Sequence, residues 1–155
     1  MRSFALAILA LVVVCGVTNA QSIDPRMGTW KLNVAKSKYS PDPHYKSQTM
    51  KYEPTDGGFK LAVDTVPPEG QPNHNETVAK ADGKDYPVKG GQNVSTRAFT
   101  RIDARTWQVV DKLNGKVTLT RKEVVSADGK TLTRIDKGTN AQGQTVNSVV
   151  IYDRQ

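Results

Sequence analysis

The sequence is poor in cysteine and histidine, the side chains on which many catalytic and metal sites depend. Its one cysteine is Cys15, and its two histidines are His44 and His74. Because Cys15 lies in an apolar N-terminal segment, the rest of the chain has no thiol nucleophile, disulfide or cysteine metal ligand. Zinc needs at least three protein ligands, and only Glu76 lies close to His74 in sequence. We therefore expect no metal site.

Catalytic motifs are also absent. The sequence has no Gly-x-Ser-x-Gly motif and no glycine-rich loop ahead of a helix. A serine triad would have to use His44 or His74, and both lie in proline-rich segments. Carboxylates on expected strands could meet inside a barrel for acid–base chemistry, and this alternative stays open for Glu53, Asp64, Asp111 and Glu123. We predict a protein that is not an enzyme, with no catalytic residues and no cofactor.

No long run of one charge sign occurs, although the net charge is +7. Lysines and arginines are spread along the chain and interleaved with aspartates and glutamates. This pattern is typical of a solvated, mildly basic surface and not of a nucleic-acid-binding stripe. We predict that the protein binds no nucleic acid.

The first 20 residues have the pattern of a cleaved signal peptide. Arg2 precedes an apolar run from Phe4 to Val14, and small residues lead to Ala20. The run is shorter than the ~20 apolar residues that a membrane helix needs. Alternatives are a retained anchor, or a lipoprotein modified at Cys15, which Val14 before the cysteine disfavours. We predict cleavage after Ala20, a secreted or periplasmic monomer without a membrane span, and one domain over residues 21–155.

Tight-turn dipeptides separate short alternating segments along the chain. Four of them, at Asp56, Asp82, Asn114 and Asp128, place a glycine second, which favours the positive φ of hairpin turns. Helical signal is limited to residues 33–40. The strands expected between the turns are Met27–Asn33, Ser47–Glu53, Phe59–Val66, Glu76–Ala81, Asp85–Val88, Val94–Ile102, Thr106–Leu113, Lys116–Ser126, Thr131–Lys137 and Gln144–Tyr152. Sequential hairpins favour an all-β fold, a single antiparallel up-and-down barrel of about 8–10 strands, over a sandwich.

The stretch Gly28-Thr29-Trp30 resembles the Gly-x-Trp signature on the first strand of lipocalins and fatty-acid-binding proteins, the calycin group. The phrases "GTWKLNVAKSKYSP", "ADGKDYPV", "SADGKTLT" and "KGTNAQGQ" further resemble small secreted bacterial proteins described only as lipocalin-like. The resemblance implies that Trp30 packs across one barrel end. It also implies that a basic residue of a late strand covers the Trp30 ring, with Arg121 and Arg134 as candidates.

The chain departs from fatty-acid-binding proteins at its last strand. That family holds a ligand carboxylate with an Arg-x-Tyr pair, whereas this chain ends "IYDRQ", with Tyr152 and Arg154 in reversed order. Residues two apart on a strand share a face, so the two side chains can still point the same way. The resemblance therefore implies a barrel interior but not a fatty-acid carboxylate site.

The predicted function is binding of a small hydrophobic or amphipathic ligand inside the barrel. The expected ligand contacts are Arg97, Arg121 and Tyr152 as polar groups and Trp107 as an apolar wall. An inward guanidinium could pair with an anionic ligand. The alternative is a side-chain-filled barrel that acts as a structural or interaction module. The side chains expected to point inward are Phe59, Leu61, Val63, Phe99, Trp107, Val109, Val117, Leu119, Arg121, Val150 and Tyr152.

Overall fold

Ten antiparallel strands and one short 3₁₀ helix make up the chain in a computed structural model, which describes residues 23–41 and 45–155. The strands alternate with tight turns, as the sequence predicts. Their bounds are β1 (Gly28–Leu32), β2 (Ser47–Thr55), β3 (Gly58–Val66), β4 (Asn73–Ala79), β5 (Asp82–Pro87), β6 (Thr96–Arg101), β7 (Thr106–Leu113), β8 (Lys116–Val125), β9 (Thr131–Thr139) and β10 (Thr145–Arg154). The helix, η1 (Val34–Lys36), lies in the segment with the expected helical signal.

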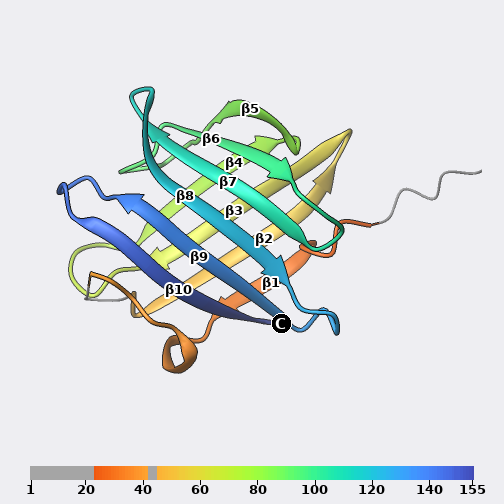
Figure 1. Ribbon diagram of the computed structural model, residues 1–155, viewed down its shortest axis with the longest axis horizontal. Coiled ribbons are helices and arrows are strands. Elements are labelled where there is room, and N and C mark those ends of the chain that lie inside the picture. The colour runs from red at the N-terminus through yellow and green to blue at the C-terminus, as the bar shows by residue number, and fades with distance from the viewer. Residues whose placement is uncertain (1–22, 42–44) are drawn as a thin grey trace, which may run out of the picture.

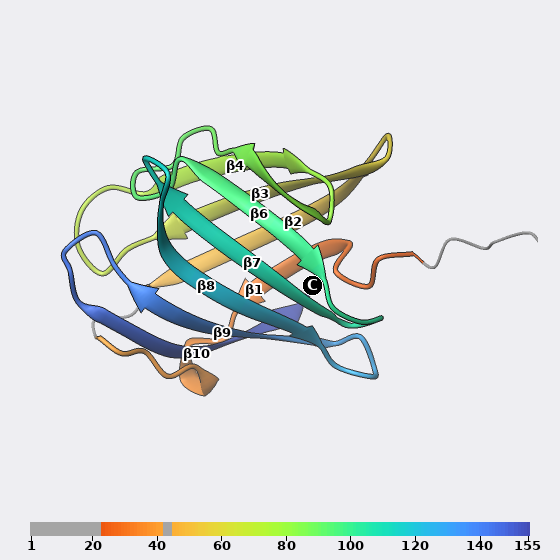
Figure 2. The ribbon, with the colours of Figure 1, turned by 45° about the horizontal axis from the view of Figure 1, so that its top comes forward.

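The strands form one sheet that curls into a nearly closed barrel (Figures 1 and 2). The sheet order is β4-β3-β2-β1-β10-β9-β8-β7-β6-β5, so all sequence neighbours pair except β4 with β5. Strand β1 pairs with β10, which closes the ring of hydrogen bonds on that side. Strands β4 and β5 do not pair, and one isolated bridge between Glu76 and Lys89 spans the break. The predicted up-and-down barrel is confirmed.

Burial alternates along the strands and identifies the inward face. Trp107 and Val109 on β7 are buried, as are Val150 and Tyr152 on β10. The prediction was wrong for Val117, which is 50% exposed. A register shift in the β7–β8 pairing lies between Asp111 and Lys112, next to the partner of Val117, so alternation does not continue to the end of the hairpin.

Most predicted turns close hairpins, with one exception. Asn114 and Gly115 connect β7 and β8 with φ values of 51° and 81°, the conformation of a tight primed turn. The dipeptide Asp82-Gly83 was predicted to close a hairpin, but it lies inside β5, where the register with β6 shifts. Because β4 and β5 diverge, this dipeptide begins an edge strand instead of joining two paired strands.

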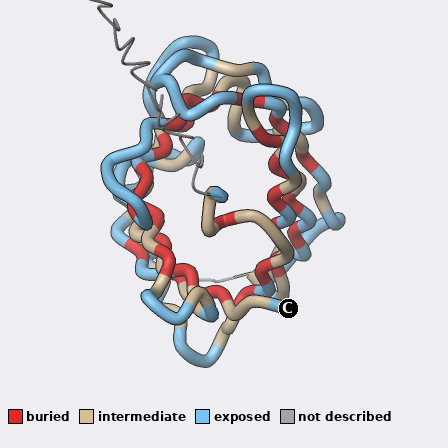
Figure 3. Tube along the Cα trace, turned by 90° about the vertical axis from the view of Figure 1, so that its right-hand side faces the viewer, coloured by how far each residue is buried: buried red, intermediate tan, exposed pale blue. Residues whose placement is uncertain are grey.

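One end of the barrel is sealed by the segment that precedes β1. Figure 3 shows this segment curling across the interior of the ring of strands. Its Arg26 is fully buried, with the guanidinium carbon 4.1 Å from the Trp107 ring centre and 4.8 Å from that of Phe59. Tyr52 and Phe99 complete a cage of rings around the guanidinium. We call Tyr52, Phe59, Phe99 and Trp107 the closed-end cage.

Trp30 packs beside this seal and ties it to the sheet. The Trp30 ring is fully buried, and its Nε1 donates a hydrogen bond to the Arg26 carbonyl at 2.7 Å. The cation over the ring is Arg154, at 4.2 Å, so the predicted candidates Arg121 and Arg134 were wrong. Arg154 also donates to the carbonyls of Pro25 and Met27. It reaches Trp30 because the two residues are register partners between β1 and β10.

Gly28 makes room for this arrangement. Its φ is +116°, and a Cβ added there would lie 2.8 Å from Nη1 of Arg154. Any other residue would be strained in its backbone and would meet the arginine that stacks on Trp30. A glycine two residues before the tryptophan is therefore a packing requirement of the closed end.

Some sequence predictions concern residues outside the described ranges. The signal peptide over residues 1–20, with Cys15 and the cut after Ala20, lies there, and so does His44. In the described part of the chain, no helix has the length and apolarity that crossing a membrane requires.

Candidate ligand-binding site

The barrel encloses a cavity of about 500 Å³ that extends from the middle of the barrel to the end opposite the seal. Met50, Leu61, Val63 and Val109 give it an apolar wall. The mouth is formed by connecting segments, which include Pro67-Pro68, Gly91–Val94 and Asn140–Gln142. The alternating strands place these side chains inward because one face of each strand points into the barrel.

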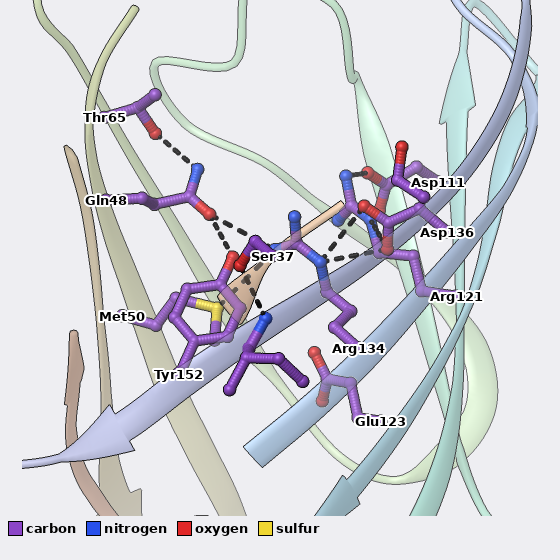
Figure 4. Close-up of polar contacts among 12 residues, drawn as sticks. Ser37, Gln48, Met50, Thr65, Asp111, Arg121, Glu123, Arg134, Asp136 and Tyr152 are labelled. Atoms are coloured by element: carbon purple, nitrogen blue, oxygen red, sulfur yellow. Dashed lines mark hydrogen bonds and ion pairs between the residues drawn. The ribbon is translucent and has the colours of Figure 1, made fainter. Parts of the chain in front are cut away.

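A chain of polar contacts runs around the inner wall (Figure 4). It starts on β2 and β3, where the Gln48 side-chain amide donates to the Thr65 hydroxyl at 2.7 Å. The Gln48 side-chain oxygen accepts from the Tyr152 hydroxyl on β10 and from Nη1 of Arg134 on β9, the latter at 3.3 Å. Arg134 also lies over the Tyr152 ring, 5.2 Å from its centre. Four strands are thus linked through one buried amide.

The chain continues through alternating charges. Nε of Arg134 pairs with Asp136 at 2.9 Å, and Asp136 lies 3.7 Å from Nε of Arg121 on β8. Nη2 of Arg121 contacts Asp111 on β7 at 2.8 Å, and Asp111 accepts from Nε of Arg97 on β6 at 2.7 Å. We call the connected set the polar belt; its members are Thr65, Gln48, Tyr152, Arg134, Asp136, Arg121, Asp111 and Arg97.

The charges in the belt stabilise one another. Burial by itself would raise the pKa of Asp111, but Arg121 and Arg97 outweigh it and hold that pKa below its usual range. Burial would likewise lower the pKa of Arg121, and Asp111 reverses the shift. Burial raises the pKa of the Tyr152 hydroxyl well above its ordinary value, so this group stays neutral. The interior therefore keeps Arg121, Arg134 and Asp111 ionised at neutral pH.

Glu123 joins the cavity to the closed end. It lines the cavity, accepts from the Tyr52 hydroxyl at 3.0 Å, and lies 3.5 Å from Nη1 of Arg26. Burial and Glu123 raise the pKa of Tyr52, so its hydroxyl remains a donor. One carboxylate thus compensates the caged arginine on one side and faces the cavity on the other.

The structure separates the four predicted ligand contacts into two groups. Arg97 and Arg121 line the cavity and share Asp111. Tyr152 is buried in the polar belt and connects to them through Arg134. Trp107 is fully buried in the closed-end cage, where it contacts Arg26, and it is not among the residues that line the cavity.

Several interior residues were not predicted to contact the ligand. Arg134, Asp136 and Gln48 are each at most 6% exposed. A signal for the first two exists, because they lie two and four residues after the buried Leu132 on one strand. Of the carboxylates considered for acid–base chemistry, Asp111 and Glu123 point inward and lie in ion pairs, whereas Asp64 is exposed on the outer face.

Comparison with known proteins gives a likeness in fold. A scan of protein-family profiles and a search of curated proteins both found no match. The fold is similar to that of the crystal structure of zebrafish ileal bile acid-binding protein complexed with cholic acid. The TM-score is 0.50 at 11% sequence identity, over 84% of this chain and 99% of that chain. At this identity the likeness shows the fold alone: the chain has a calycin-like β-barrel.

Proposed function

We propose that the protein binds a small hydrophobic or amphipathic molecule inside the barrel without transforming it. The observation that carries this proposal is the cavity of about 500 Å³ in the barrel, whose lining combines apolar side chains with members of the polar belt. Ligand cavities commonly have volumes of about 300–1,000 Å³ and a few convergent polar groups. The similar fold of a protein whose crystal structure holds cholic acid gives further support.

The proposal includes the contacts and the place of action. Arg97 and Arg121 contact the polar part of the ligand directly, Tyr152 acts through the belt, and Trp107 closes the far end. The N-terminal segment is a signal peptide cut after Ala20, and the mature chain is a secreted or periplasmic monomer. The sequence phrases given above support a relationship to the small secreted bacterial lipocalin-like proteins.

Native mass spectrometry tests these points together. The full sequence is expressed in a bacterium, purified from the periplasm, and measured before and after delipidation. We expect a monomer that begins at Gln21 and carries an added mass that delipidation removes. A bare polypeptide mass would contradict the binding proposal, and a retained N-terminus would contradict the cleavage.

A matched pair of variants locates the ligand. Val63→Phe places a larger side chain in the cavity, and Val78→Phe places the same side chain on the outer face, where Val78 is 59% exposed. We expect the added mass to disappear from the first variant only. Loss from both variants, or from neither, would count against a site inside the barrel.

A further inference from the structure

The charged groups of the cavity balance one another. Among the described residues, the charged side chains that line it are Arg97, Arg121, Arg134, Asp111, Glu123 and Asp136. The first three pair with the two aspartates, and Glu123 pairs with the caged Arg26. Arg26 in turn pairs with Asp24 at 2.8 Å. These four guanidinium groups therefore face four carboxylates, and each guanidinium has a carboxylate partner.

This balance disfavours a charged ligand. A carboxylate that enters the cavity loses its hydration and finds each arginine already paired with an aspartate. A cationic ligand meets the same difficulty at the aspartates, which are paired with arginines. An uncharged head loses far less hydration, and its oxygens can still accept hydrogen bonds from the guanidinium groups, which carry more N–H donors than the two aspartates can accept.

The polar belt is interrupted at the break between β4 and β5. On one side, Nη1 of Arg97 on β6 is a buried donor with no hydrogen-bond partner in the described protein. On the other side, the same holds for two acceptors on β4, the side-chain oxygens of Asn75 and Thr77. Asn75 and Arg97 both line the cavity, and Thr77 follows Asn75 on the same strand face. Buried polar groups are costly without partners, so a ligand that supplies them binds more tightly.

We propose that the ligand is an uncharged amphiphile whose head carries both hydroxyl and carbonyl or ether oxygens, and that this head completes the polar belt between Arg97 and Asn75. Its oxygens accept from Arg97, and its hydroxyl donates to Asn75. Its apolar part lies against Met50, Leu61 and Val63. This inference rests on the proposed function and specifies the ligand class for the same cavity.

Three probes with the same chain length test the charge preference: 1-decanoylglycerol, decanoate and decyltrimethylammonium. Each is titrated calorimetrically into the delipidated protein at neutral pH. We expect the glycerol ester to bind at least ~10-fold more tightly than either ion, equivalent to about 1.4 kcal/mol. Decanoate binding as tightly as the ester would overturn this inference and leave the proposed function standing.

Removing one carboxylate should change the preference. Asp111→Asn leaves an arginine without its full counter-charge, so we expect decanoate to gain ~10-fold relative to the ester. Asp136→Asn also removes a carboxylate charge beside Arg121, and it replaces the first variant in this test if Asp111→Asn does not fold. The matched control is Asp85→Asn, whose carboxylate pairs with Lys112 at a more exposed site. An equal shift in the control, or no shift in the folded Asp111 and Asp136 variants, would overturn the inference.

A negative result is also informative. If none of the three probes binds and the native mass shows no added ligand, the proposed function fails and this inference fails with it. If none binds but the native mass does show a ligand, only the inference on ligand class fails. The same native spectra that test the function therefore separate the two conclusions.

Discussion

The two ends of the barrel both bury arginine, but they surround it differently. At the closed end, Arg26 lies in a cage of four aromatic rings and touches Glu123 at 3.5 Å. In the cavity, Arg97, Arg121 and Arg134 lie in a chain of carboxylate and amide partners. Ring faces attract a cation electrostatically at short range, so the four rings lie close around Arg26 and fill this end of the barrel. Carboxylates hold arginines against the wall by directed contacts, which leaves the centre of the barrel free.

The difference separates stability from binding within one barrel. The closed end fills its interior with large side chains, so changes there should alter mainly the free energy of unfolding. The open end keeps a cavity, so changes there should alter mainly ligand affinity. Glu123 lies at the boundary, because it contacts Arg26 and also lines the cavity.

Trp30→Ala should have the largest effect on stability. The ring is fully buried, holds the Arg26 carbonyl and lies under Arg154. We expect a loss of about 3–5 kcal/mol in the free energy of unfolding, as for other large aromatic truncations. Urea denaturation measures it. A loss below ~1 kcal/mol would show that Trp30 does not seal the barrel end.

Arg26→Ala should lower the free energy of unfolding by about 3 kcal/mol, at the lower end of the range for breaking a buried ion pair. The loss is no larger because Glu123 keeps its hydrogen bond from Tyr52. The matched second variant adds Glu123→Gln, which removes the buried charge that has lost its arginine; Asp24, the other partner of Arg26, is partly exposed to water. We expect the double variant to regain part of the lost stability in urea denaturation. Equal stability of the single and double variants would mean that packing, and not charge, holds Arg26.

Thr77→Val should have a smaller effect, of opposite sign. The Thr77 hydroxyl is buried without a partner in the described protein, and valine keeps its shape. We expect the unfolding free energy of the ligand-free protein to rise by about 1 kcal/mol, since an unmet hydrogen-bond requirement is removed. Thr65→Val is the contrasting control, because Thr65 accepts from Gln48. A loss of stability in both variants would contradict the finding that the Thr77 hydroxyl has no hydrogen-bond partner in the described protein.

The outer face gives the smallest effect. His74 Nδ1 donates to the Asp64 carboxylate at 2.7 Å, and the His74 imidazole lies 3.3 Å from Glu76; the hydrogen bond to Asp64 raises the His74 pKa above its ordinary value. Protonated His74 therefore adds stability at low pH, and this is lost as pH rises through the raised pKa. An NMR titration of the imidazole should show the pKa fall in Asp64→Asn while ligand affinity is unchanged. An unchanged pKa would contradict the contact.

The barrel could be predicted from the sequence because local signals determine where its strands and turns lie. Alternation and glycine turns placed all ten strands, and the exception at Asp82 arose where two neighbours diverge without pairing. The alternation along the strands also indicated inward positions that the sequence predictions did not use. On β7, Asp111 follows Trp107 and Val109 at intervals of two, so its inward position was readable. A charged residue in phase with buried apolar residues indicates an interior polar group.

The closed end could not be predicted, because its contacts join segments far apart in sequence. Nothing local marks Arg26 as buried, since it precedes the first strand and follows Pro25. Arg154 stacks on Trp30 through the pairing of β1 with β10, a register that turn chemistry does not specify. Arg121 and Arg134 were plausible partners by strand order, but the aspartates beside them hold them in the cavity.

The pairing of β1 with β10 has a consequence for the order of folding. The other paired strands are neighbours in sequence and can form hairpins locally. Trp30 and the arginine that covers it come from strands separated by nearly the whole described chain. Closing so long a loop is entropically costly, so the seal should form late. Until then the rings of the closed-end cage are open to other chains. Aggregation during refolding should therefore respond more strongly to changes that weaken the β1–β10 pairing than to changes in a hairpin between sequence neighbours.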